Sequence, residues 1–328
     1  MICSSGQWPC SPRVQRNHAR YGIWEVGVGV WGSVTLTNFC ECSAAPEPTQ
    51  YPRAIEPSLQ IPTPNSQIRL TILGAGPAAP NTGGACSGYL VQHTSTTLLL
   101  DCGSGVAGRI GQHVPPNRLN GVVISHLHPD HYFDLIPLYY ILRFGPPRPA
   151  ELGPRLPLVV PPGGRAFLHR LLDLIADDQA MLDDIFEVDE YAADRRIEFG
   201  SLRVQPHAVQ HYIPSHAMRI NAAGGPTLVF SSDAAPCPQL VEAARDADLF
   251  LCESAIVDTT QDRPDPLQRG HLTAAEAGAA ARKAAVKRLL LTHYRSGPEY
   301  DAQHYAAAAS TFGGPVELAQ EGRTYRVG

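Results

Sequence analysis

The feature that most constrains the fold is a repeated arrangement in which short apolar runs end in a side chain that can bind a metal ion or a proton. "TLLLD" ends at Asp101, "VVISH" at His126, "LVFSSD" at Asp233, "LFLCE" at Glu253 and "LLLTH" at His293. Short apolar runs bounded by polar residues are typical of buried strands. Because functional sites in α/β proteins lie beyond the carboxyl ends of the strands, these ends predict one convergent site.

The remaining segments of residues 67–328 indicate further strands and helices. "IRLTILGAG", "SGYLVQH" and "LPLVVP" have the composition of strands, and "IEFGSLRVQPHAV" that of a hairpin. Residues 164–176 carry apolar side chains at helical spacing up to Ile175, and Thr273 followed by Glu276 forms a capping box that predicts a helix start. Early strands are linked by hairpins and later ones by helices, which indicates a layered α/β domain with mixed sheets.

Residues 1–66 differ in composition from this domain. Arginines and a weakly apolar stretch precede the proline-rich "CSAAPEPTQYPRAIEPSLQIPTPN". We predict an N-terminal extension, either signal-like or disordered with a proline-rich linker, or an overlong start, followed by the domain at 67–328. Glu25 and several glycines interrupt the apolar stretch, so no stable membrane span is expected. We favour a cytoplasmic location, with export through this segment as the alternative.

The segment "SHLHPDHYFDL" concentrates side chains that bind metals. His126 and His128 are two positions apart and face the same way on an extended chain, while Asp130 and His131 follow on the turn. Imidazole and carboxylate groups are good ligands for zinc and similar divalent ions. Four ligands so close together do not easily serve one tetrahedral ion, so the segment predicts two ions that share a bridging group.

This segment and other motifs before and after it resemble those of the metallo-β-lactamase superfamily. The motifs "LLLDCGSG", "HYIPSHAMRI", "FSSDAAP", "LCESA", "GHLTAAEAG" and "LLLTHYRS" match it in order, over about residues 68–328. The paired glutamate and histidine motifs are similar to those of the ribonuclease Z-like branch, which includes cyclic-nucleotide phosphodiesterases. The resemblance implies an α/β fold, the αββα sandwich with two mixed β-sheets flanked by helices.

The resemblance also implies a ligand set for two divalent metal ions, zinc first, with Mn²⁺ or Fe²⁺ as alternatives. Carried over by residue, one ion would be held by His126, His128 and His211, the other by Asp130, His131 and His293, and Asp233 would bridge them together with a water or hydroxide. His207, four residues before His211, is the competing ligand, and the motif match favours His211.

Four residues receive roles beyond metal binding. His271 lies on a loop just before the helix that begins at Thr273, and is expected to protonate the leaving group. Glu253 would orient His271 by accepting its other N–H, and Asp130 is assigned to the catalytic set as well as to the ligands. Asp101 would hydrogen-bond a ligand histidine from behind.

The resembling families differ in substrate, and the number of residues between the third histidine and the bridging aspartate distinguishes the tRNA-processing members from the others. Bacterial tRNA-processing members carry a protruding basic arm between the third histidine and the bridging aspartate, but His211 and Asp233 are only 22 positions apart. A net charge of −5 also gives no surface for tracking a phosphate backbone. We therefore predict hydrolysis of a small phosphodiester, such as a cyclic nucleotide, by a metal-bound hydroxide, with RNA as the less favoured substrate.

Several alternatives stay open at this stage. They are a tRNA 3′-processing endoribonuclease, or an arylsulfatase, phosphotriesterase or lactonase. A non-catalytic metal-binding module is least favoured, because it would need neither His271 nor Glu253. Homodimers are common in the resembling group, so a homodimer is compatible with the sequence. Residues 145–205 are expected to govern specificity, with the acidic "LIADDQAMLDDIFEVDEY" either a helical cover near the cleft or a solvated helix and loop, and His216 is expected in the cleft or at the surface.

Overall fold

The structure is a computed structural model that describes residues 67–145, 154–176, 178, 181–192, 195–263, 265 and 268–328. The first described strand begins at Ile68, next to the predicted start of the domain at Gln67. The predicted N-terminal extension, residues 1–66, lies outside the described residues, and so do parts of the region expected to govern specificity. The division of the chain at residue 67 therefore stays a prediction.

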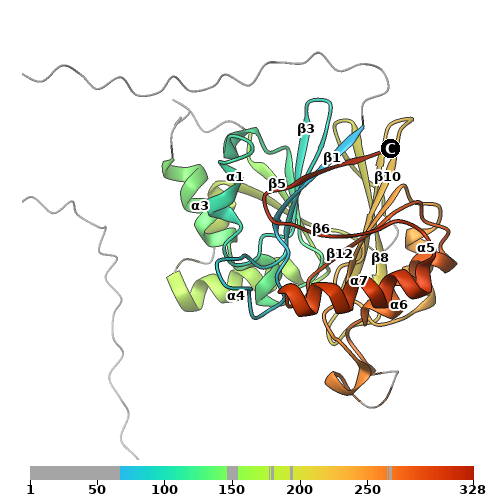
Figure 1. Cartoon of the computed structure of the whole chain (residues 1–328). Coiled ribbons are helices and arrows are strands. Elements are labelled where there is room, and N and C mark those ends of the chain that lie inside the picture. Colours follow the sequence, from blue (N-terminus) through green and yellow to red (C-terminus); the bar gives the residue numbers. More distant parts are fainter. Residues whose placement is uncertain are drawn as a thin grey trace, which may run out of the picture. The chain divides into compact units, whose positions relative to one another are not determined.

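Within the described residues, the strands form two seven-stranded sheets (Figure 1). The first sheet contains, in spatial order, β14 (Thr324–Val327), β1 (Ile68–Gly74), β2 (Gly88–His93), β3 (Thr96–Leu100), β4 (Gly121–Val123), β5 (Leu156–Val160) and β6 (Phe186–Glu190). The second contains β13 (Val316–Leu318), β12 (Leu289–Thr292), β11 (Leu249–Glu253), β10 (Thr227–Phe230), β9 (Ser215–Ala222), β8 (Leu202–Val209) and β7 (Ile197–Phe199). Both sheets mix parallel and antiparallel pairs, as the sequence predicts.

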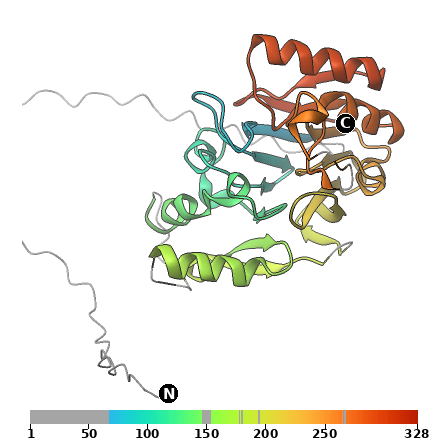
Figure 2. The same ribbon diagram turned by 90° about the horizontal axis from the view of Figure 1, so that it is seen from below.

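The two sheets pack face to face, and helices cover their outer faces (Figures 1 and 2). Buried side chains of both sheets form the central core, where Tyr89 of β2 contacts Phe230 of β10 with ring centroids 5.0 Å apart. The first sheet is covered by α1 (Ala107–Ile110), α3 (Leu135–Phe144) and α4 (Gly164–Ala176), and the second by α5 (Pro238–Ala244), α6 (Ala274–Lys283) and α7 (Pro298–Phe312). This is the predicted αββα sandwich.

Local sequence explains how two of the helices are placed. The predicted capping box is present, because the Thr273 side chain accepts from the Glu276 N–H while the Glu276 carboxylate accepts from the Thr273 N–H. Helix α4 buries Leu168 and Leu172, but Ile175 in its last turn is 54% exposed. The buried stripe of α4 is therefore shorter than its apolar spacing predicts.

The prediction of a helix in the acidic segment "LIADDQAMLDDIFEVDEY" is wrong from Met181 onward. A short 3₁₀ turn, η2 (Met181–Asp184), leads into strand β6, which pairs with β5 in parallel. In "FEVDE", Phe186 and Val188 are buried while Glu187 and Asp189 are exposed. This alternation has the period of a strand. The segment forms a strand because Phe186 and Val188, on one face of β6, pack into the core.

The connection between β9 and β10 matches the prediction of a short link. Residues 223–226 alone join the two antiparallel strands, with Asn221 of β9 opposite Thr227 of β10. No inserted arm stands between His211 and Asp233.

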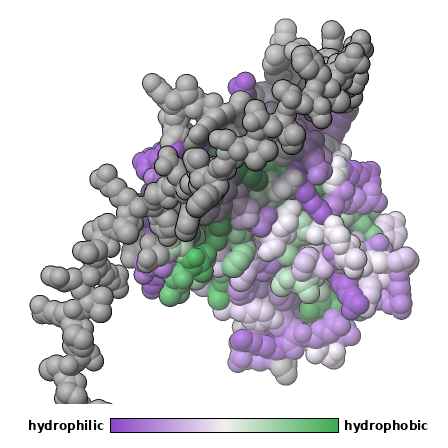
Figure 3. All heavy atoms as spheres, turned by 90° about the vertical axis from the view of Figure 1, so that its left-hand side faces the viewer, coloured by the Kyte–Doolittle hydropathy of each residue, from purple (hydrophilic) through white to green (hydrophobic). Residues whose placement is uncertain are grey.

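The outer face of the first helix layer carries exposed apolar side chains. Figure 3 shows them gathered on the face that lies at the left of Figure 1, where α3 and α4 are. Large apolar residues at least 42% exposed there include Phe133, Tyr140, Phe144, Leu174 and Ile175. Within the part of the chain that the structure describes, we find no helix with the length and apolar character that a membrane crossing needs.

Replacing Phe230 by alanine tests the contact between the sheets. We expect Phe230→Ala to lower the free energy of unfolding by about 3–5 kcal/mol, because it removes a buried ring that both sheets contact. Phe144→Ala is the matched control, since Phe144 is 59% exposed, and should cost about 1 kcal/mol or less. Denaturant unfolding of both variants measures the difference, and equal losses would contradict a core that joins the sheets at this point.

Candidate metal centre

The seven predicted ligands come from loops at the carboxyl ends of strands in both sheets. From the first sheet, the chain after β4 supplies His126 and His128, and the short helix α2 (Pro129–Tyr132) supplies Asp130 and His131. From the second sheet, His211 lies between β8 and β9, Asp233 follows β10, and His293 directly follows β12. They form two groups that meet at Asp233, and within each group the potential ligand atoms all lie within 4.8 Å of one another.

The first group consists of three imidazoles and one oxygen of Asp233. His128 Nδ1 lies 3.2 Å from His126 Nε2 and 3.0 Å from His211 Nε2. Asp233 Oδ2 lies 3.7 Å from His126 Nε2 and 4.0 Å from His211 Nε2. These are the three histidines that the resemblance assigns to one ion.

The second group combines two imidazoles with two carboxylates. His131 Nε2 lies 3.4 Å from Asp130 Oδ2 and 3.4 Å from Asp233 Oδ1. His293 Nε2 lies 3.2 Å from Asp233 Oδ2 and 3.8 Å from Asp130 Oδ2. Asp233 therefore faces both groups, in the position predicted for the bridging residue.

Neighbouring groups fix the far nitrogen of several ligand histidines. Asp101 Oδ2 lies 2.7 Å from His131 Nδ1, and the same carboxylate accepts from the Ser125 N–H and hydroxyl. The Gly270 carbonyl lies 2.7 Å from His211 Nδ1. Because a carboxylate or carbonyl only accepts, each Nδ1 carries a proton and each ring turns its Nε2 towards the site.

The far nitrogen of His293 is contacted by a serine, since the Ser87 hydroxyl lies 3.0 Å from His293 Nδ1. The Asp101 placement agrees with its predicted position behind a ligand histidine. Sequence reasoning missed Ser87 and Gly270, since a single serine and a main-chain carbonyl leave no recognisable pattern.

These residues fit two divalent cations. Among the described side chains, His131 Nε2 and Asp233 Oδ1 are buried without a hydrogen-bond partner, although buried polar atoms are normally satisfied. In the first group, His128 Nδ1 lies within hydrogen-bonding distance of both His126 Nε2 and His211 Nε2. One proton on His128 Nδ1 can satisfy only one of these two contacts well. Converging lone pairs and carboxylates suit cations such as Zn²⁺, Mn²⁺ or Fe²⁺.

The electrostatics of the buried ligands point the same way. Burial lowers the pKa of His126 well below its usual value and that of His211 to about 4, so both rings are neutral ligands at neutral pH. Burial alone would raise the pKa of Asp233, but the imidazoles of His293 and His131 hold it well below its usual range. Burial likewise acts against protonated His131, yet the carboxylates of Asp233 and Asp101 raise its pKa.

His271 and Glu253 lie together beside the ligands, as predicted. His271 Nδ1 is 3.0 Å from Glu253 Oε1, and the His271 ring lies 5.0 Å from the ring of His211 and 6.1 Å from that of His293, measured between centroids. The buried Glu253 carboxylate also accepts from the N–H groups of Ala234 and Ala255. The His271 side chain is 20% exposed, so its free Nε2 can reach a bound molecule.

Burial alone would lower the pKa of His271, but the carboxylates of Glu253 and then Asp233 raise it to about 9. A cation bound beside Asp233 would offset part of this rise. With or without such a cation, Glu253 holds one proton on His271 Nδ1. The second proton of the ring, on Nε2, is therefore the one that can be exchanged with a bound molecule.

Two other histidines belong to neither group of potential ligands. His207 stands opposite Ala217 in the β8–β9 pair and belongs to neither ligand group. His216, expected in the cleft or at the surface, is instead buried at 5% exposure, with its ring 5.0 Å from that of Tyr191. The His216 side chain points into the space between the sheets, because it lies on the same face of β9 as the core residues Met218 and Ile220.

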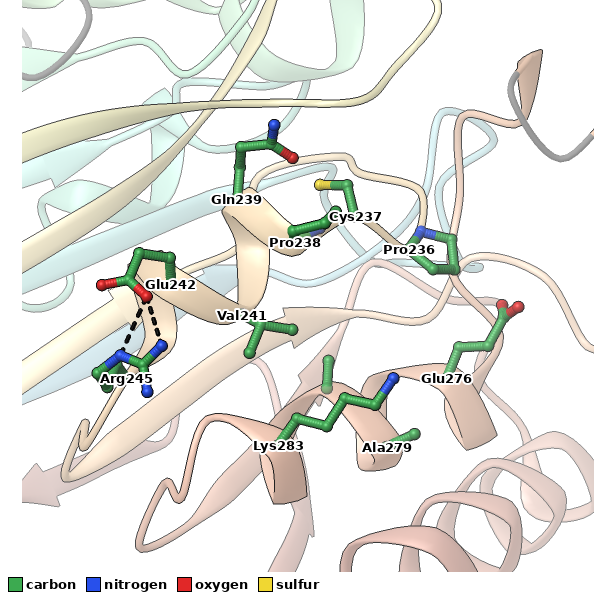
Figure 4. Close-up of a pocket in the computed structure, with 11 residues that line it drawn as sticks. Pro236, Cys237, Pro238, Gln239, Val241, Glu242, Arg245, Glu276, Ala279 and Lys283 are labelled. Carbon is green, nitrogen blue, oxygen red and sulfur yellow. Dashed lines mark hydrogen bonds and ion pairs between the residues drawn. The ribbon is translucent and has the colours of Figure 1, made fainter.

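A groove of about 720 Å³ runs between α5 and α6 on the outer side of the second sheet (Figure 4). Pro236, Val241 and Ala280 are among its lining residues, and Glu242 is paired with Arg245 beside them. None of its lining residues belongs to the predicted ligand set. The candidate site is therefore separate from this groove.

Comparison with known proteins identifies the family. A family model described as a β-lactamase superfamily domain matches residues 96–294. The chain belongs to this superfamily. An uncharacterized protein of Mycobacterium leprae is 35% identical over 273 residues, which cover 79% of this chain and 89% of that protein. A ribonuclease Z of Myxococcus xanthus is 29% identical over 307 residues, with 79% of this chain and 97% of the relative covered.

The structure of the metallo-β-lactamase-fold protein YhfI from Bacillus subtilis is similar, with a TM-score of 0.68 and 26% identity over 79% of this chain and 99% of that one. The predicted resemblance, the predicted fold and the prediction of a metal-dependent hydrolase are thereby confirmed at the level of the superfamily. The residue roles stay predictions, since none of these comparisons assigns them.

Replacing Asp101 by asparagine tests the support behind the ligands. Asp101→Asn keeps the size of the side chain but weakens the hold on His131 Nδ1, so we expect divalent metal affinity to fall about 10- to 100-fold. Competition with a chromogenic chelator measures it. Asp258→Asn is the matched control, because the Asp258 carboxylate accepts from Thr260 on an exposed turn and should leave the affinity unchanged. Equal affinities in all three proteins would remove Asp101 from the site.

Proposed function

We propose that this chain is a dinuclear-metal hydrolase that cleaves the phosphodiester bond of small substrates, with cyclic nucleotides as the first candidates. One observation carries the proposal: the His271–Glu253 pair lies beside two groups of converging ligands. A site that only stores metal has no use for a protonated imidazole placed at its edge. Two bound divalent ions would supply polarisation of a phosphoryl oxygen and a water of lowered pKa.

The residues of the chain divide the remaining work. Glu253 accepts from His271 Nδ1–H, so the protonated imidazolium gives its Nε2 proton to the leaving oxygen and is left as the neutral Nδ1–H tautomer. The need for this proton grows as the leaving group becomes a poorer one, such as a sugar alkoxide. Asp130 lies within 4 Å of His131 and His293, and we assign it to orient the attacking water as well as to bind metal.

The preference for small substrates rests on what surrounds the site. Residues 223–226 form only a tight connection between β9 and β10, and the net charge of the chain is −5. A protein that follows a long phosphate backbone neutralises it with clustered lysine and arginine. Zinc as the native ion, a cytoplasmic location and a homodimer remain predictions that accompany this proposal.

A substrate panel with a His271 variant tests the function. We expect the metal-loaded protein to cleave bis-p-nitrophenyl phosphate and cyclic AMP, and His271→Ala to lower kcat for cyclic AMP by about 10²- to 10⁴-fold. The loss should be much smaller for bis-p-nitrophenyl phosphate, whose leaving group needs no proton. Steady-state kinetics with metal analysis measure both effects, and His113→Ala, an exposed histidine, is the control. An aryl sulfate, a phosphotriester and a lactone complete the panel.

Two outcomes would contradict the proposal. If the wild type with two bound metals cleaves no phosphodiester, the function is wrong. If His271→Ala keeps full activity towards cyclic AMP at unchanged metal content, the role of His271 is wrong.

The second candidate is a tRNA 3′-processing endoribonuclease, favoured by the similarity to a relative named ribonuclease Z. The absence of an arm between β9 and β10 among the described residues argues against it. We expect no correct 3′ cleavage of a precursor tRNA at protein concentrations that hydrolyse cyclic AMP, as gel analysis with a ribonuclease Z control would show. Correct cleavage would replace the first proposal by the second.

A further inference from the structure

A buried carboxylate that the functional assignment does not use lies on the segment between Glu253 and His271. Asp262 follows η3 (Thr259–Gln261), and its side chain has none of its surface exposed. Its Oδ2 accepts from the main-chain N–H of Gly270 at 3.0 Å and of His271 at 3.1 Å. One carboxylate oxygen thus holds two consecutive peptide groups, one of which carries the proposed proton donor.

The other oxygen of Asp262 is occupied as well. The Tyr212 hydroxyl donates to Oδ1 at 2.5 Å. The Tyr212 ring lies over Gly270 so closely that a Cβ at position 270 would come within 2.5 Å of it, which explains the glycine. Tyr212 is the neighbour of the ligand His211, so Asp262 connects two functional loops.

The same short loop is held from its opposite side. The Gly270 carbonyl accepts from His211, and the Arg269 carbonyl accepts from the Gln210 amide at 3.1 Å. The Arg269 guanidinium is paired with Glu276 at 2.7 Å, and its Nε lies 4.0 Å from Asp262. Buried Asp262 therefore has a cation nearby, so its charge is partly compensated.

We propose that Asp262 is a positioning residue that sets the main-chain placement of His271 relative to the ligand His211. This inference rests on the proposed function, in which His271 protonates the leaving group. Glu253 fixes only the ring of His271 through Nδ1, whereas the distance of the ring from the ligands depends on where its main chain lies. Proton transfer requires hydrogen-bonding distance, so a shift of the loop weakens it without removing any ligand.

Amide exchange tests the structural part of the proposal without any need for activity. In Asp262→Ala we expect the amides of Gly270 and His271 to exchange about tenfold faster or more, measured residue by residue by NMR, because both lose their acceptor. Asp262→Asn is the conservative variant, since its amide oxygen still accepts from both N–H groups, and should restore most of the protection. Asp258→Asn, on the same segment, should change neither amide.

Kinetics test the functional part. Asp262→Ala should lower kcat for cyclic AMP by about 10- to 100-fold, with KM, metal content and the rate with bis-p-nitrophenyl phosphate nearly unchanged. Tyr212→Phe removes only the hydroxyl contact to Asp262 and should lower kcat in the same substrate-selective way, to a smaller extent. Should Asp262→Ala fail to fold, Tyr212→Phe carries the comparison, with Asp262→Asn as the variant that keeps the contacts to both N–H groups.

The outcomes separate this proposal from the proposed function. Unchanged exchange of Gly270 and His271 in Asp262→Ala overturns the positioning role, whatever the activity. Equal losses with both phosphodiesters, together with lost metal, also overturn it, because Asp262 would then act through the ligands. A wild type without phosphodiesterase activity defeats the proposed function, while the exchange data still decide whether Asp262 places the loop.

Discussion

The candidate site depends on one buried carboxylate, Asp233, surrounded by imidazoles from both sheets. His126 and His131 reach it from the first sheet, and His211 and His293 from the second. A buried carboxylate is stable only with compensating charge or hydrogen bonds. The four imidazoles that approach Asp233 are in place only when the two sheets are packed, so the central core and the site form together.

The chain reaches this arrangement through strained residues at strand ends. Asp101, Ser232 and His293 have φ values of 54°, 55° and 55°, in the left-handed region that disfavours side chains. Such residues cost of order 1–3 kcal/mol each and persist where the surroundings determine them. These three residues lie at or just beyond the carboxyl ends of β3, β10 and β12, where the chain leaves each strand for the site. Gly103 allows a similar close approach, since a Cβ there would come within 1.9 Å of the Asp130 carbonyl.

Much of the site was predictable, and particular residues show why the rest was not. Asp101, Glu253 and His293 follow apolar runs in the sequence, so their placement at one edge of a sheet needs only the rule for parallel strands. Asp262 and Tyr212 have no such pattern. Asp262 contacts Gly270 across an irregular loop, and it is joined to Tyr212 by a hydrogen bond between residues 50 positions apart. The acidic residues of β6 favour a helix or a solvated loop from the sequence, because they conceal the alternation of the strand. Tyr191 directly follows β6, and its hydroxyl lies 2.9 Å from the Ser125 carbonyl.

The sequence by itself determined the superfamily, the sandwich fold and the identity of the residues able to bind metal. The superfamily and the fold followed from a resemblance of several motifs in the same order along the chain, and each motif is short enough to be read from local sequence. The motif match favours His211 over His207 as a predicted ligand, and the tertiary structure places His211 in a group of converging side chains. Only the tertiary structure decided that His216 is buried between the sheets. It also decided which groups hold each imidazole. Those outcomes depend on how segments far apart in the sequence approach one another, as those of His128 and His211 do, and local sequence does not specify such contacts.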